Sequence, residues 1–101
     1  MKLLHLSLLA AASLVVVANA QADEALAKAK NCLACHAVDK KVVGPSYKDV
    51  AKKYTAKDEA MLAEKIVKGG KGNWGAIPMP PNASVSADEA GKLAKWILSQ
   101  K

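Results

Sequence analysis

The sequence predicts a small all-α domain. Its 101 residues allow one domain, and its apolar residues recur at the three- and four-residue spacing of amphipathic helices. No run of β-branched residues alternates in the period-two pattern of a strand. Serine or threonine followed three residues later by an acidic residue marks three helix starts. These features together predict about four short helices and connecting loops.

The expected helices follow one another along the chain. The first runs from Asp23 to about Cys35, with acidic residues in its first turn. The others open at the three capping signals and cover residues 46–53, 55–68 and the chain beyond 86. Residues 69–85 lack helical periodicity and hold four of the six glycines and three of the four prolines. A loop of that length in so small a domain is usually functional.

Residues 1–20 have the features of a cleaved export signal. Lys2 gives a basic start, an apolar run extends from Leu6 to Ala18, and Ala18 and Ala20 form the small-x-small pattern that signal peptidase recognises. The apolar run is short for a membrane span, which needs about 20 residues. We therefore expect a signal peptide at 1–20, a domain at 21–101, a periplasmic location and no stable membrane insertion.

The charge of the expected domain is positive. One lysine and no acidic residue fall in residues 1–20, so 14 lysines minus 9 acidic residues leave a net charge of +5. The chain contains no arginine, and its few aromatic residues are not interleaved with the lysines, which disfavours nucleic acid as a partner. Because so small a domain has few large apolar side chains, it usually needs a disulfide, a metal or a cofactor to hold together.

The segment Cys32-Leu33-Ala34-Cys35-His36 decides the class. Cys-x-x-Cys-His is the attachment sequence of c-type haem, in which two thiols add to the vinyl groups and the histidine reaches the iron. Cys32 and Cys35 are the only cysteines, and His36 is the only histidine after residue 20. A covalently held haem would also supply the apolar body that the core lacks.

Three other uses of the two cysteines compete with haem. A disulfide between Cys32 and Cys35 would close a very short loop with little entropic gain. A redox dithiol would need an α/β framework, which the helical pattern does not provide. A zinc site needs four ligands, and His36 brings the number of good candidates only to three. We therefore favour haem.

The iron of a low-spin electron carrier needs a sixth ligand, which Met61, Met79 or a lysine can supply. Met61 lies inside an expected helix, where methionine commonly fills gaps in the core. Met79 lies between Pro78 and Pro80, which stiffen the loop without secondary structure. Imidazole and thioether together favour ferrous iron and raise the reduction potential. We predict Met79 as the ligand; the alternative is a proline-rich turn with an incidental methionine.

The chain resembles the bacterial class I cytochromes c of the cytochrome c-551 type, also called cytochrome c8. The similarity runs through nearly all of residues 21–101 and is most specific in segments 32–36, 43–50, 74–82 and 93–101. It implies a small class I cytochrome c fold wrapped around one covalent haem c.

The resemblance implies a role for each residue of the haem attachment. Cys32 and Cys35 would form the thioethers, and His36 and Met79 would be the axial iron ligands. The carbonyl of Pro45 would accept a hydrogen bond from the far ring nitrogen of His36 and so fix the orientation of the ring. The alternative for Pro45 is simple punctuation of a loop.

Three further residues are implied around the haem. Asn82 would direct its amide toward the sulfur of Met79, and Trp74 would bond a haem propionate through its indole N–H. Lys65 stands where the family commonly has an arginine near the propionates, and it keeps the charge but not the planar fork. The simpler alternatives are a turn residue at Asn82 and a rim aromatic at Trp74.

The expected function is single-electron transfer, not catalysis. A peroxidase would want a distal histidine or arginine, and His36 is already committed while arginine is absent. A gas sensor would need an output domain for which the chain has no room. We expect a monomer whose lysines are either a solvated surface or a collar that steers it to acidic patches. The resemblance suggests respiratory partners such as a haem cd-type nitrite reductase, a terminal oxidase or a cytochrome c peroxidase.

Overall fold

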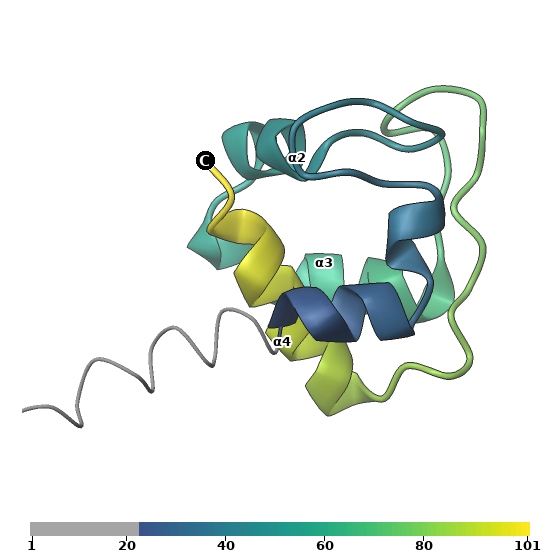
Figure 1. Ribbon diagram of the computed structural model, residues 1–101, viewed down its shortest axis with the longest axis vertical. Helices are drawn as coiled ribbons and strands as arrows, with labels where there is room; N and C mark the ends of the chain where they lie inside the picture. Colours follow the sequence, from purple (N-terminus) through teal and green to yellow (C-terminus); the bar gives the residue numbers. More distant parts are fainter. Residues whose placement is uncertain (1–22) are drawn as a thin grey trace, which may run out of the picture.

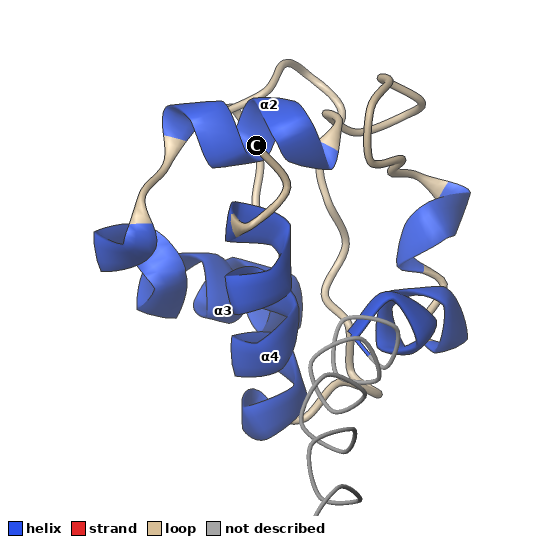
Figure 2. Cartoon of the chain, turned by 60° about the vertical axis from the view of Figure 1, so that its left-hand side comes forward, coloured by secondary structure: helices blue, strands red, loops and turns tan. Residues whose placement is uncertain are grey.

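The computed structural model describes residues 23–101, in which the chain forms short helices joined by loops (Figure 1). Residues 23–29 are helical. The later elements are the 3-10 turn η1 (Cys32–Ala34), helix α2 (Tyr47–Lys53), the 3-10 turn η2 (Ala56–Asp58), helix α3 (Glu59–Lys68) and helix α4 (Ala87–Leu98). The described residues contain no strand, only isolated bridges (Figure 2). The predicted all-α class is confirmed, whereas the expected signal peptide lies outside the described residues.

The capping signals place the helix starts correctly. The Ser46 hydroxyl accepts the backbone N–H of Asp49 at 3.1 Å and opens α2. The pair Ser86 and Glu89 is fully reciprocal, with both bonds near 3 Å, at the start of α4. Thr55 opens η2, which continues directly into α3. Each cap satisfies N–H groups that the first turn leaves without partners, so the signal is local and readable from the sequence.

The first helix ends earlier than predicted. Its helical residues end at Ala29, and Asn31 then adopts a left-handed conformation with φ of 64°. Asparagine tolerates this region better than most residues. The prediction of one helix from Asp23 to about Cys35 was therefore wrong: a break at Asn31 separates the helix from η1, although the apolar spacing continues across it.

The core gathers on one face of α4. Helix α3 packs along α4, and α2 lies against it near the C-terminal end of the chain (Figure 1). Leu93 of α4 is 1% exposed, and Ala27 from the first helix packs into the same cluster with no exposure. The cluster continues through Tyr47 of α2 and Ile66 of α3, both of which also line the large cavity described below. Core and cavity therefore share their walls.

Residues 69–85 form the irregular loop that the sequence predicts. They contain no helix or strand, and the loop runs around the outside of the helices in Figure 1. Gly70 and Met79 close its base as an isolated antiparallel bridge. None of the helices within residues 23–101 combines the length and the apolar character needed to cross a bilayer.

Candidate functional site

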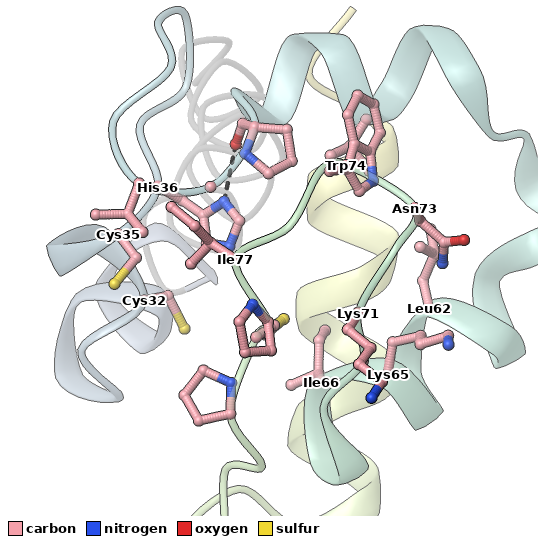
Figure 3. Close-up of a pocket in the computed structure, with 18 of the residues that line it drawn as sticks. Cys32, Cys35, His36, Leu62, Lys65, Ile66, Lys71, Asn73, Trp74 and Ile77 are labelled. Carbon is pink, nitrogen blue, oxygen red and sulfur yellow. Dashed lines mark hydrogen bonds between the residues drawn. The ribbon is translucent and has the colours of Figure 1, made fainter.

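A cavity of about 450 Å³ lies between the helices and the 69–85 loop. Figure 3 shows Cys32, Cys35 and His36 on one side of it, with Leu62 and Lys65 of α3 opposite. Every site residue that the sequence predicted lines this single cavity. They are Cys32, Cys35, His36, Pro45, Lys65, Trp74, Met79 and Asn82.

The two cysteines are presented by a tightly bonded turn. The carbonyl of Cys32 accepts the backbone N–H groups of Cys35 and His36 at 3.2 and 3.0 Å. The carbonyl of Cys35 in turn accepts the N–H groups of Val43 and Gly44 at 3.2 and 2.7 Å. Both thiols are free, so the structure does not support the disulfide alternative.

A zinc site also finds no support in the structure. Within the described residues, no three histidine, cysteine or acidic side chains come close enough together to hold a metal ion. Because structural zinc needs four such ligands, the two thiols and His36 lack the partners that this alternative requires.

The ring of His36 is held by a hydrogen bond to Pro45. Nδ1 of His36 lies 2.8 Å from the Pro45 carbonyl (dashed line in Figure 3). A carbonyl only accepts, so Nδ1 must carry the proton and donate it. The lone pair is then on Nε2, which is the atom left to bind a metal. This is the hydrogen bond that the family resemblance implies for Pro45.

Two contacts that the sequence reasoning missed also hold the His36 ring. Tyr47 is 3% exposed and stacks on it, with ring centroids 5.1 Å apart and planes 21° apart. Gly44 is so close that a Cβ there would lie 2.9 Å from Nδ1 and nearer still to Cε1. The sequence signal for both residues was their place in segment 43–50, one of the segments that carry the family resemblance.

Met79 is fixed through its backbone. Its N–H donates to the Gly70 carbonyl at 2.8 Å, and its carbonyl accepts the Gly70 N–H at 3.0 Å. Gly69 has φ of 76°, and a Cβ there would meet the Met79 carbonyl and lie 2.9 Å from the nitrogen of Pro81. The half-buried Met79 side chain packs against the core cluster and lines the cavity.

Asn82 ties the loop to α3. Its side-chain amide donates to the Ile66 carbonyl at 2.7 Å, and its backbone N–H donates to the Val67 carbonyl at 3.1 Å. The amide has a second hydrogen, so this bond leaves the implied contact with the sulfur of Met79 a prediction.

Trp74 and Lys65 stand at the edge of the cavity. Trp74 is 41% exposed, and its ring lies edge-on to Tyr54 with centroids 6.5 Å apart. The Lys65 side chain runs close to Gly70, where a Cβ would lie 3.2 Å from Nζ. Both residues line the cavity, and their contacts with propionates remain predictions.

The cavity wall is positively charged. Four lysines line it, namely Lys30, Lys41, Lys65 and Lys71, and none of the described lining residues is acidic. Burial raises the pKa of the Cys32 thiol and, more strongly, the pKa of the Tyr47 phenol. Both groups are therefore neutral near pH 7, and the wall suits a group with an apolar body and anionic substituents.

Comparison with known proteins identifies the family. A model of the cytochrome c family matches residues 20–101. The chain belongs to the cytochrome c family. Cytochrome c-552 of Nitrosomonas europaea is 54% identical over an alignment of 103 positions, which covers 100% of both chains. Cytochrome c-551 of Pseudomonas aeruginosa is 59% identical over 99 residues, or 95% of this chain and 94% of the relative.

A solved structure of a relative supports the assignment of this chain to the cytochrome c family. The crystal structure of wild-type Nitrosomonas europaea cytochrome c552 matches with a TM-score of 0.73 and 56% identity, over 77% of this chain and 99% of that one. The class I cytochrome c fold predicted from the resemblance is confirmed. The protein is a small electron carrier, and its cofactor is one covalent haem c.

The residues present fit that cofactor. Two free thiols and an imidazole with an available Nε2 lie on one side of a cavity lined largely by apolar side chains. Lys41, Lys65 and Lys71 can pair with carboxylates, whereas Lys30 is already paired with the Glu89 carboxylate at 3.6 Å. Cys32 and Cys35 would hold the haem covalently, and His36 would bind its iron.

Proposed function

We propose that this cytochrome is a periplasmic carrier with His36 and Met79 as axial ligands, which passes single electrons between respiratory partners. When bound, haem c supplies reversible exchange between ferrous and ferric iron. The protein's part is to hold two ligands of fixed geometry, to exclude water and to present one edge of the site to partners. The periplasmic location rests on the export features of residues 1–20.

The observation that carries the proposal is the way Met79 is held. Two backbone hydrogen bonds to Gly70 fix its position, and Pro78 and Pro80 restrict the backbone on either side. Met79 lines the same cavity as His36, whose Nε2 is left free by the hydrogen bond of Nδ1 to Pro45. A ligand fixed in both oxidation states keeps the structural change on electron transfer small, which a fast carrier needs.

Met61 is the competing sulfur ligand. It also lines the cavity, but it lies within α3 and its backbone belongs to the helix. Its side chain is half-buried, and methionine in a helix commonly fills a gap in the core. Met61 is therefore the matched control for Met79.

The lysines that line the cavity support the proposal that the redox partners have acidic docking patches. Lys41, Lys65 and Lys71 line the cavity, and Val43 and Ile77 beside it are 45% and 68% exposed. A positive rim attracts an acidic partner from a distance, and apolar side chains then allow close approach. Respiratory enzymes such as a haem cd-type nitrite reductase, a terminal oxidase or a cytochrome c peroxidase are the partners that the family resemblance suggests.

Absorption spectra of the haem-loaded protein test the ligand assignment. The ferric wild type should have the weak long-wavelength sulfur-to-iron band. Met79→Ala should lose this band and, once reduced, bind carbon monoxide readily, whereas Met61→Ala should keep it. The reverse pattern would assign the ligand to Met61. A wild type without the band would leave the sixth position open and favour an enzyme or a sensor over a carrier.

A further inference from the structure

The tip of the Met79 loop is held by very few contacts. Residues 71–78 are all exposed and make no backbone–backbone hydrogen bond in the structure. Gly72 and Gly75 have φ of 88° and 117°, and a Cβ at either would meet nothing within 4 Å. Nevertheless this segment forms one wall of the haem cavity. In the protein itself, contacts from residues outside this segment must therefore hold the wall in place.

Lys53 is the residue that reaches the tip. Its ammonium lies 4.7 Å from the ring centroid of Trp74 and 5.5 Å from that of Tyr54, and it donates to the Asn73 carbonyl at 3.3 Å. The two rings also meet edge-on. Within residues 23–101, every hydrogen bond and ring contact found at this tip involves Lys53 or Tyr54.

The place of Lys53 in the fold suits this role. It is the last residue of α2, where the helix dipole favours a cation. Tyr54 follows as the C-cap, and its N–H bonds the Val50 carbonyl at 3.0 Å. Both groups that touch the tip therefore stand on a helix end that is anchored in the core through Val50.

We propose that Lys53 is a positioning residue: its ammonium holds Trp74 and the 71–78 loop against the end of α2, and so keeps Met79 turned into the haem cavity. Loss of the contact frees the tip, while the bridge between Gly70 and Met79 stays as the hinge of the loop. The effect on Met79 as a ligand rests on the proposed axial ligation; the effect on Trp74 does not.

The chain offers matched variants for a test. Lys53→Gln removes the charge and the ring contacts. Lys53→Arg keeps both, because a guanidinium also stacks on aromatic rings and donates hydrogen bonds. Lys52→Gln removes the same charge one residue earlier, from an exposed position of α2 that makes no hydrogen bond, ion pair or ring contact in the described structure. This control distinguishes the loss of the Lys53 contacts from a general loss of positive charge.

The first readout is the motion of the Trp74 indole N–H in the ferrous, haem-loaded protein, measured by ¹⁵N relaxation. The chain has two tryptophans, so the indole of buried Trp96 is an internal reference. We expect an order parameter of about 0.85 in the wild type and in Lys53→Arg, and a fall to about 0.6 in Lys53→Gln alone. An unchanged value in Lys53→Gln would overturn the proposal.

The second readout is the rate at which saturating imidazole, neutral at pH 8, displaces the sixth ligand from the ferric protein. Lys53→Gln should raise this rate about two- to fivefold, the factor expected for an exposed cation–π contact. Lys52→Gln and Lys53→Arg should leave this rate unchanged. Equal rates in Lys52→Gln and Lys53→Gln would overturn the proposed role of Lys53. If the wild type already reacts as fast as Met79→Ala, the axial assignment fails instead, and the Trp74 measurement still decides the role of Lys53.

Discussion

Replacing Gly44 with alanine tests whether close packing fixes the His36 ring. The glycine is not among those with positive φ, so alanine meets no backbone strain there. The new Cβ would instead lie 2.9 Å from Nδ1 and 3.0 Å from Nε2 of His36. The ring must move, and moving it stretches the hydrogen bond to Pro45 and disturbs the stack on Tyr47.

The expected cost follows from these contacts. Forcing one extra methyl group against a packed ring costs about 1–3 kcal/mol. Gly91 provides the matched control: it lies inside α4, its φ is not positive, and a Cβ there meets nothing within 4 Å. Alanine at Gly91 should stabilise the protein by about 0.5–1 kcal/mol through helix propensity. The same chemical change is thus expected to have opposite signs at the two positions.

Guanidinium unfolding of the haem-loaded variants, followed by circular dichroism, measures both free energies of unfolding. The ferric absorption spectrum reports whether the iron environment changes as well. We expect a perturbed spectrum in Gly44→Ala and a wild-type spectrum in Gly91→Ala. Gly44→Ala with wild-type stability and spectrum would refute the view that this contact holds the ring.

Three further substitutions test the core and the surface ties. Leu93→Ala should cost about 2–5 kcal/mol in denaturant unfolding, because Leu93 is 1% exposed. Lys30→Gln should cost about 0.5–1.5 kcal/mol, more at low salt than at high, since it loses the Ser84 carbonyl at 2.9 Å and the Glu89 carboxylate at 3.6 Å. The Ser86 N–H, and then Lys30, lower the pKa of Glu89. Its contribution is therefore complete above the unfolded value, about 4.3, and is lost as the pH falls through the folded value. Glu89→Gln should accordingly flatten the acid side of a stability–pH curve.

The helix starts were predictable because their causes are local. Ser46 and Ser86 cap the helices that follow them by accepting the backbone N–H of the residue three positions on, and at Ser86 the Glu89 carboxylate bonds back to the cap. The end of the first helix was missed because the prediction followed apolar spacing, which carries no information on the backbone angle of Asn31. The available signal was the asparagine itself, which often ends a helix in the left-handed conformation. Periodicity shows which side chains face inward, and it shows this equally well for a helix and for a helix with a break.

The residues of the candidate site likewise divide into those that the sequence reveals and those that only the folded structure reveals. Cys32, Cys35 and His36 are recognisable because the chemistry requires them side by side in the chain. Gly44 and Tyr47 act on the His36 ring through packing, which depends on how the 41–45 loop folds back.

Lys53 was one of many lysines in the sequence. Its role depends on Trp74, which lies in a distant part of the chain and meets α2 only in the folded protein. A contact between two such positions leaves no local pattern, so a single sequence offered no means to separate Lys53 from Lys52.

The His36 side of the cavity is restrained by more contacts than the Met79 side, and this difference determines which side opens first. On the His36 side, a hydrogen bond, a ring stack and a close glycine all restrict one imidazole. On the Met79 side, the loop has its base bridge, the bonds of Asn82 to α3 and the contact of Lys53 at the tip. Local opening follows the element with the fewest buried contacts, so the loop should open while the His36 side stays intact. Substitutions beside His36 should therefore change the global free energy of unfolding, whereas those at the loop tip should change how often the Met79 side opens.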